Sequence, residues 1–257
     1  EAMTALDEMM VGKKFKDAGN KVIIEEFMVG KEVSILSFTD GKTIVPMVSS
    51  QDHKRAHDND EGLNTGGMGT FSPSKAYTKE HEKETMEKII LPTMHAMNAE
   101  GRTFKGVLYF GLMITDKGVK VVEYNARFGD PETQVVLPRL KTDLYEIFDA
   151  IIDERLSDIN IEWDDSAAVC VIIASGGYPE SYKKGVPITI GDLDKDIVLY
   201  HAGTAFKDGR LVTSGGRVIG VTAKGKDIDE ARAKAYANVD KVAFEGAFYR
   251  RDIGIKK

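Results

Sequence analysis

The pattern of apolar and polar positions predicts strands and helices in the first 160 residues. Residues 1–19 show helical spacing that ends at Gly19, and the apolar face holds Ala2, Leu6, Met9 and Met10. Runs rich in β-branched residues predict strands over 21–28, 32–39, 43–50, 106–115 and 119–126. Asp40-Gly41 between two such runs is a strong hairpin signal. Helices are predicted over 78–100, with a kink or break at Pro92, and over 144–156, capped by Thr142 or Asp143.

The character of the chain changes near residue 160. Segment 157–166 is polar and linker-like, and it holds the only tryptophan, Trp163. Beyond it we predict strands at 167–175, 187–190, 197–204, 211–213 and 217–223, and a helix over 228–242. We therefore expect an α+β fold with a boundary between 157 and 166. Residues 1–160 should form an antiparallel sheet with helices on one face, and 165–257 a smaller α+β domain that closes the site.

Composition excludes several classes of protein. The 257 residues carry a net charge of −6, so there is no basic footprint for nucleic acid. No apolar run approaches the ~20 residues that cross a bilayer, and no signal-peptide pattern opens the chain. Cys170 is the single cysteine, so no internal disulfide forms, which agrees with a reducing compartment. These features predict a cytoplasmic protein without a membrane partner.

The most informative segment is VVEYNARFGDPETQ, residues 121–134. Glu123 and Asn125 are two positions apart on a predicted strand, so both should face the same way. A carboxylate and an amide oxygen suit Mg²⁺, with substrate phosphates and water completing its shell. Arg127 adds a planar fork for carboxylate or phosphate, and Asp130 follows it in the turn. The alternative is a strand that runs into a polar turn with solvated charges.

Two further clusters could carry chemistry. At 23–32, Glu25, Glu26 and Phe27 end a strand and Glu32 follows, which could serve an adenine edge and ribose hydroxyls or could be an acidic edge strand. Residues 51–73 form a polar stretch too long for an ordinary connection, so the loop is functional or disordered. Within it, Asp52, Lys54 and Arg55 could bind a zwitterion, and the glycines of 64–69 could approach a phosphate.

Other readings of this loop stay open. His53 and His57 are equally consistent with polar loop contacts and with catalysis. Neither the Walker A pattern nor the Rossmann fingerprint occurs in the chain.

Taken in order, several segments resemble the glycinamide ribonucleotide synthetase (phosphoribosylamine–glycine ligase) family of ATP-grasp enzymes. In the first half they are EEFMVGKEVS, QDHKR, NTGGMG and VVEYNARFGDPETQ. In the second half they are ASGGYPESYKKG (174–185), HAGTAF (201–206), TSGGRVIGVTA (213–223) and FYRRDIG (248–254). The resemblance covers essentially the whole chain.

The resemblance implies a role for each candidate residue. Glu123 and Asn125 match the magnesium (or manganese) ligands of the family. Its adenine and ribose hinge corresponds to Glu25, Glu26, Phe27 and Glu32, and its glycine and acyl-phosphate region to Asp52, Lys54, Arg127 and Asp130. The implied reaction uses ATP to activate glycine as glycyl phosphate, which 5-phosphoribosylamine attacks to give glycinamide ribonucleotide in purine biosynthesis.

The resemblance also implies that this chain is one part of a longer protein. The family's N-terminal domain and first ATP-grasp subdomain, with its phosphate-binding lysines and Gly-rich flap, have no counterpart among these residues. We therefore expect the second ATP-grasp subdomain plus the C-terminal domain, inactive alone. The rivals are another ATP-grasp carboxylate–amine ligase and a nucleotide-binding fragment.

Overall fold

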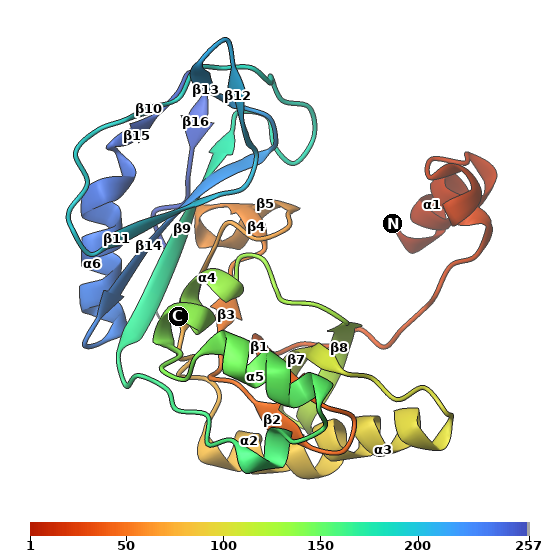
Figure 1. The fold of residues 1–257 in the computed structure, drawn as a ribbon. Coiled ribbons are helices and arrows are strands. Elements are labelled where there is room, and N and C mark those ends of the chain that lie inside the picture. Colours follow the sequence, from red (N-terminus) through yellow and green to blue (C-terminus); the bar gives the residue numbers. More distant parts are fainter. Residues whose placement is uncertain (256–257) are drawn as a thin grey trace.

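Two antiparallel sheets organise the computed structural model, which describes residues 1–255 (Figure 1). The first sheet has the strand order β2-β1-β7-β8, and the second the order β11-β14-β9-β6-β3 with β16 beside β9. The strands of the first sheet are β1 (Lys31–Thr39), β2 (Ile44–Pro46), β7 (Gly106–Thr115) and β8 (Gly118–Asn125). Those of the second are β3 (Gln51–Asp52), β6 (Gly69–Ser72), β9 (Ala167–Ser175), β11 (Ile197–His201), β14 (Arg217–Gly225) and β16 (Ala247–Phe248). The expected α+β class is confirmed.

Shorter elements complete the fold. Three two-stranded ribbons pair β4 (Arg55–His57) with β5 (Glu61–Asn64), β10 (Thr189–Ile190) with β15 (Val242–Ala243), and β12 (Thr204–Lys207) with β13 (Arg210–Thr213). The α-helices are α1 (Ala2–Leu6), α2 (Lys79–Thr85), α3 (Leu91–Ala99), α4 (Thr133–Val136), α5 (Leu144–Ile152) and α6 (Ile228–Val239).

Three apolar clusters hold these layers together. Side chains of one face of the first sheet, such as Phe110, pack on the helical segment from α2 to α3. The opposite face, including Phe38, meets α4, α5 and one face of β9. Helices therefore cover both faces of the first sheet and not the one face expected, because both faces carry apolar side chains. The other face of β9 and β14 packs on α6. Strand β9 is buried along its whole length because it lies between two of these clusters.

The second sheet combines strands from distant parts of the chain. β6 pairs antiparallel with β9, and Phe71 lies opposite Val169. Trp163, inside the polar segment 157–166, forms an isolated bridge with Leu140 and packs at the edge of the cluster around Phe38. The boundary between 157 and 166 stays a prediction.

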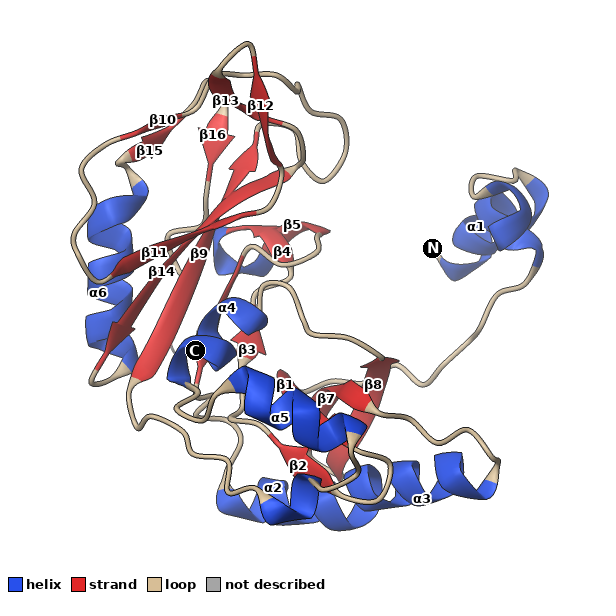
Figure 2. Ribbon diagram, viewed as in Figure 1, coloured by secondary structure: helices blue, strands red, loops and turns tan. Residues whose placement is uncertain are grey.

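The N-terminal segment departs from the predicted pattern. Its helical turns run over Ala2–Leu6 and Asp7–Val11, and a 3-10 segment Lys16–Asn20 follows, so the helix ends before Gly19. The strand predicted over 21–28 is wrong. This stretch is a loop that leads away from the sheets (Figure 2), and Ile23 and Phe27 are 86% and 90% exposed. No described strand pairs with this stretch, so its β-branched residues remain in a loop.

The segment 51–73 is also more ordered than predicted. It contains β3, β4, β5 and β6, and β6 is fully buried. Strands of two to four residues are too short to show a period in the sequence, and pairing with β9 supplies the order that the local pattern lacks.

Most other predicted elements are confirmed. Both hairpins, β1–β2 and β7–β8, are antiparallel. The helix predicted over 78–100 begins at the cap Thr78. It changes to a π turn at Met86–Ile90, which ends two residues before Pro92, and continues to Ala99. Asp143 caps α5, because its side chain accepts a hydrogen bond from the Tyr145 amide at 2.8 Å.

Candidate functional site

The polar end of the first sheet places the predicted metal ligands on one face. In the strand register Glu123 lies opposite Gly111 and Asn125 lies opposite Tyr109. Because paired residues share a face, Glu123 and Asn125 point the same way. Gly111 provides the room for Glu123, since a Cβ at this position would lie 2.8 Å from Glu123 Cγ. The sheet thus presents a carboxylate and an amide side by side.

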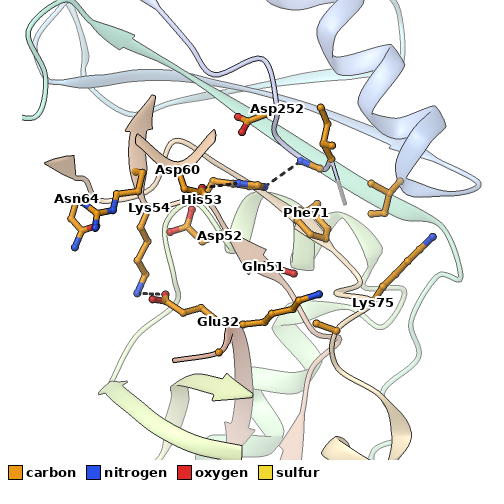
Figure 3. A pocket seen from close by; sticks show the side chains of 17 residues that line it. Glu32, Gln51, Asp52, His53, Lys54, Asp60, Asn64, Phe71, Lys75 and Asp252 are labelled. Atoms are coloured by element: carbon orange, nitrogen blue, oxygen red, sulfur yellow. Dashed lines mark hydrogen bonds and ion pairs between the residues drawn. The ribbon is translucent and has the colours of Figure 1, made fainter. Parts of the chain in front are cut away.

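Lys54 lies across this face and links it to the loop after β3. Its Nζ is 2.9 Å from Glu32 Oε2 and 4.0 Å from Glu123 Oε1, and Figure 3 shows it reaching from the loop to Glu32. Burial alone lowers the pKa of a lysine. The hydrogen bond that Lys54 donates to Glu32 and the charges of Glu32, Glu123 and Asp52 outweigh burial, so the pKa of Lys54 is raised. Lys54 therefore stays cationic among three carboxylates.

A buried polar network lies beneath Lys54. Glu132, only 4% exposed, accepts hydrogen bonds from Tyr109 Oη at 3.0 Å and Ser34 Oγ at 3.1 Å. The two hydroxyls are 2.8 Å apart. Burial and the nearby Glu132 charge raise the pKa of Tyr109 above its usual value, so its hydroxyl keeps its proton and remains a donor. This network ties β1 and β7 to the turn before α4.

Asp52 is a carboxylate in an unfavourable environment. Burial and the charge of Glu132 raise its pKa well above the usual range, although Lys54 and Arg217 oppose this shift. Its Oδ1 is buried and has no hydrogen-bond partner among the described residues. Burial makes the charged form of Asp52 costly, so a positively charged group brought close to Oδ1 would favour that form.

Arg217 connects the second sheet to two loops of the site. Its Nη1 donates to the carbonyl oxygens of Gly66 and Asp130, both at 2.8 Å, and lies 3.3 Å from Asp130 Oδ1. The amide of Gly66 donates a second hydrogen bond from this loop, to Tyr178 Oη at 2.9 Å. The Gly-rich loop and the turn at Asp130 are therefore held together from β14.

A cavity of about 600 Å³ opens beside these groups, between the two sheets (Figure 3). Side chains from the first half of the chain form most of its wall, and the segment after β16 closes another side. Its charged lining residues are Lys31, Glu32, Asp52, Lys54, Arg55, Asp60, Lys75 and Asp252. The cavity is thus lined by the same loop that carries Lys54.

The structure brings together only some of the predicted site residues. Glu32, Asp52, Lys54 and Glu123 interact, Asn125 shares their face of the sheet, and Asp130 joins them through Arg217. Glu25, Glu26 and Phe27 do not line the cavity. Glu26 pairs with Lys120 at 2.6 Å, and Phe27 is exposed. Arg127 is also exposed, and its Nη1 donates to the neighbouring Phe128 carbonyl at 2.8 Å.

Four contributors were not among the predicted site residues. Ser34 lies two positions after Glu32 on the same strand, and Glu132 lies in the motif that holds Asp130, so both could have been found by extending known patterns. Tyr109 and Arg217 carry no local signal, because their contacts depend on the register of β7 and on contact between the sheets.

The donor set fits a divalent cation that arrives with a phosphate ligand. Within residues 1–255, no cluster of three or more His, Cys, Asp or Glu side chains could hold a metal ion alone. Glu123 and Asn125 supply two oxygen donors, the number that Mg²⁺ often takes from a protein when phosphates and water complete the octahedron. Carboxylate and amide oxygens suit Mn²⁺ equally.

Helix length also bears on the kind of protein. Across residues 1–255, none of the helices combines the length and apolar character that a bilayer crossing requires.

Comparison with known proteins identifies the family. Residues 1–133 match the model of the phosphoribosylglycinamide synthetase ATP-grasp (A) domain, and 168–256 match the model of its C domain. A phosphoribosylamine–glycine ligase of Caldanaerobacter subterraneus is 50% identical over 253 residues, covering 98% of this chain and 61% of the relative. The trifunctional purine biosynthetic protein adenosine-3 of Gallus gallus is 49% identical, covering all of this chain and 26% of that protein.

A solved structure supports the same assignment. The crystal structure of phosphoribosylamine–glycine ligase from Thermotoga maritima superposes with a TM-score of 0.77 at 38% identity, covering 89% of this chain and 57% of that one. The chain therefore spans about 60% of the length of the bacterial relatives it matches. Both domain models and the superposition agree that the chain belongs to the phosphoribosylglycinamide synthetase family.

Proposed function

We propose that the protein containing this chain ligates glycine to 5-phosphoribosylamine with ATP, giving glycinamide ribonucleotide, ADP and phosphate. The observation that carries the proposal is the pairing of Glu123 and Asn125 on one face of the sheet, beside Lys54 and Glu32, in a chain of this family. A carboxylate–amide pair beside a lysine suits the binding of a nucleoside triphosphate together with its metal ion. The reaction belongs to purine biosynthesis, for which we propose a cytoplasmic location.

In this proposal each group has a task. Glu123 and Asn125 hold Mg²⁺ or Mn²⁺, which when bound neutralises charge on the transferred phosphoryl group. Lys54 and Arg127 bind anionic oxygens, and Asp130 lines the acyl-phosphate site. Asp52, whose Oδ1 lacks a partner, receives the ammonium group of glycine, because a cation favours its charged form. The glycine carboxylate attacks the γ-phosphorus and ADP leaves, after which the amine of phosphoribosylamine attacks the carbonyl carbon and phosphate leaves.

Each segment of the chain is assigned a part of the nucleotide site. We propose that 1–160 supplies one wall of the nucleotide site and 165–257 closes it, while the remainder of the longer protein supplies the opposite wall and the phosphoribosylamine side. Glu25, Glu26 and Phe27 are proposed to meet adenine together with Glu32, since their loop is exposed and Glu26 pairs with Lys120 on β8, the strand that carries Glu123. The 257-residue chain is then inactive alone.

The test uses the full-length protein and the 257-residue chain in parallel. Product formation is followed as glycinamide ribonucleotide and ADP with glycine, phosphoribosylamine and Mg·ATP. We expect turnover only from the full-length protein, and a fall in kcat of about a hundred-fold or more for Glu123→Gln, because removal of one charge-stabilising group costs this much. Glu154→Gln is the control, since Glu154 pairs with Lys42 and Lys105 away from the cavity.

Several outcomes would contradict the proposal. If the full-length protein releases ADP only with a carboxylate other than glycine or an amine other than phosphoribosylamine, it is a different ATP-grasp ligase. A Glu123→Gln variant with wild-type turnover at saturating Mg²⁺ would remove the metal assignment. Turnover by the 257-residue chain alone would refute the need for a second wall.

A further inference from the structure

Arg217 joins two loops of the site from outside both of them. It is the first residue of β14, in the second sheet, and its side chain is 20% exposed. We propose that Arg217 is a positioning residue, which holds the Gly-rich loop 64–69 against the turn 127–131 so that Asp52 and Asp130 keep their places for the ligation. This inference rests on the proposed function for its kinetic consequence, but its structural consequence stands independently.

The contacts of the guanidinium carry the inference. One nitrogen, Nη1, donates to the carbonyl of Gly66 and to the carbonyl of Asp130 at 2.8 Å each. These two acceptors belong to loops that are otherwise far apart in the sequence. Hydrogen bonds from a charged donor are stronger than neutral ones, so a single side chain can couple the two loops.

The glycines show how closely the loops approach. A Cβ at Gly66 would lie 2.9 Å from Arg217 Cζ, so the guanidinium rests directly on this backbone. Gly67 has a φ of +116°, and a Cβ there would lie 2.5 Å from Pro131 Cδ and 2.7 Å from Asp52 Oδ1. The Gly-rich loop is therefore the layer between Arg217 on one side and Asp52 with Pro131 on the other.

Tyr178 fastens the same loop from a second direction. Its hydroxyl accepts the hydrogen bond from the Gly66 amide at 2.9 Å. Its ring lies on Gly216, where a Cβ would come within 2.1 Å of Tyr178 Cδ2. Because Gly216 precedes Arg217, the two residues that hold Gly66 also support each other. The backbone of Gly66 is thus held at its N–H by Tyr178 and at its C=O by Arg217.

This arrangement predicts an effect on rate without an effect on nucleotide binding. The side chain of Arg217 donates its hydrogen bonds to Gly66 and Asp130, and not to Glu32 or the metal ligands. Loosening the loop would let Asp52 and Asp130 shift, and a displacement of about 1 Å at a reacting group can cost on the order of a hundred-fold in rate. The KM for Mg·ATP should change little.

The experiment compares Arg217→Ala, Arg217→Lys and Arg210→Ala in the full-length protein. Arg210 lies on β13 and is exposed, so its removal gives the same change in charge away from both loops. For Arg217→Ala we expect kcat to fall about ten- to hundred-fold, with KM for Mg·ATP within about two-fold. Lysine can keep one of the two carbonyl contacts, so Arg217→Lys should lie between wild type and alanine.

Amide hydrogen exchange provides a readout that does not depend on activity. The amides of Gly66 and Met68 should exchange faster in Arg217→Ala, while those of β7 remain unchanged, and Arg210→Ala should match wild type in both regions. Wild-type protection of these amides in Arg217→Ala would overturn the inference, whatever happens to kcat. Faster exchange with wild-type kcat would also overturn it, because the clamp would then have no role in positioning.

The two proposals fail in different ways. If the wild-type protein makes no glycinamide ribonucleotide, the proposed function is wrong, and the exchange experiment still decides whether Arg217 holds the loop. If Arg217→Ala does not fold, Arg217→Lys decides, and wild-type kcat and exchange in that variant contradict the inference.

Discussion

Removal of the Arg250 side chain should destabilise the folded protein more than any other single change at the C-terminal end. Arg250 is 1% exposed. It donates to Asp252 Oδ1 and Oδ2 at 2.7 Å each, to Asp60 Oδ1 at 2.9 Å and to the Arg55 carbonyl at 3.0 Å. The side chain therefore fastens the C-terminal segment to the β4–β5 hairpin.

The expected loss for Arg250→Ala is about 3–5 kcal/mol, the usual cost of removing one partner from a buried ion pair. The greater part comes from Asp252, whose side chain is 13% exposed and would keep its charge with only the hydrogen bond from the Asn59 amide. Asp60 is 52% exposed and can be solvated, so it contributes less. Urea unfolding of the 257-residue chain, followed by far-ultraviolet circular dichroism, measures the loss.

The neighbouring Arg251 provides the matched control. Its guanidinium lies 5.3 Å from the centre of the Tyr249 ring and is exposed, a contact worth about 0.5–1 kcal/mol. If Arg250→Ala costs no more than Arg251→Ala, the buried ion pair contributes no more to stability than an exposed contact, which contradicts the prediction.

The pH dependence gives a second check. Burial opposes ionisation of Asp252, but the hydrogen bonds and charge of Arg250 outweigh it, so the pKa of Asp252 lies well below its usual value. A group with a lowered pKa in the folded state stabilises above its unfolded pKa, about 3.9, and this contribution is lost as the pH falls below that value. Arg250→Ala should weaken this acid dependence, and an unchanged dependence would contradict the assignment.

Two further predictions concern the shared core. Burial raises the pKa of the Cys170 thiol to about 12. Iodoacetamide at pH 8 should therefore leave Cys170 unmodified in the folded protein and alkylate it in urea. Alkylation of the native protein at the rate of a free thiol would contradict this and show that β9 opens. The Phe148 ring packs edge-on against Phe38 and Phe128 at 6.4 and 6.3 Å, and because it is 37% exposed, Phe148→Ala should cost about 2 kcal/mol, less than a fully buried ring. Tyr145→Ala on the same helix is 76% exposed and should stay within about 0.5 kcal/mol, and equal losses in thermal unfolding would refute the role of the aromatic contact.

Long apolar runs made much of the fold predictable. Strands such as β7 and β9 bury residues on both faces, so their continuous runs of apolar residues are visible in the sequence. The failure at 21–28 has a physical reason, because composition reports that a segment could join a sheet but not whether a neighbouring strand is present. The reverse holds for β6, which has only four residues and is ordered by its pairing with β9.

The site divides in the same way. Alternation along a strand predicted that Glu123 and Asn125 share a face, since this follows from local geometry. The contact between Arg217 and Asp130 joins residues 87 positions apart, and no local pattern contains it. The raised pKa of Asp52 likewise depends on the burial created by folding and on Glu132 approaching from another segment.

The pairing of β6 with β9 has a consequence for synthesis on the ribosome. The strand that pairs with Gly69–Ser72 is Ala167–Ser175, which is translated only after the whole first sheet and its helices. Until then β6 can pair only with β3, a strand of two residues. The edge of β6 that pairs with β9 in the folded protein has no strand beside it during this time. The order of translation therefore makes the first half of the chain dependent on the second for its final architecture.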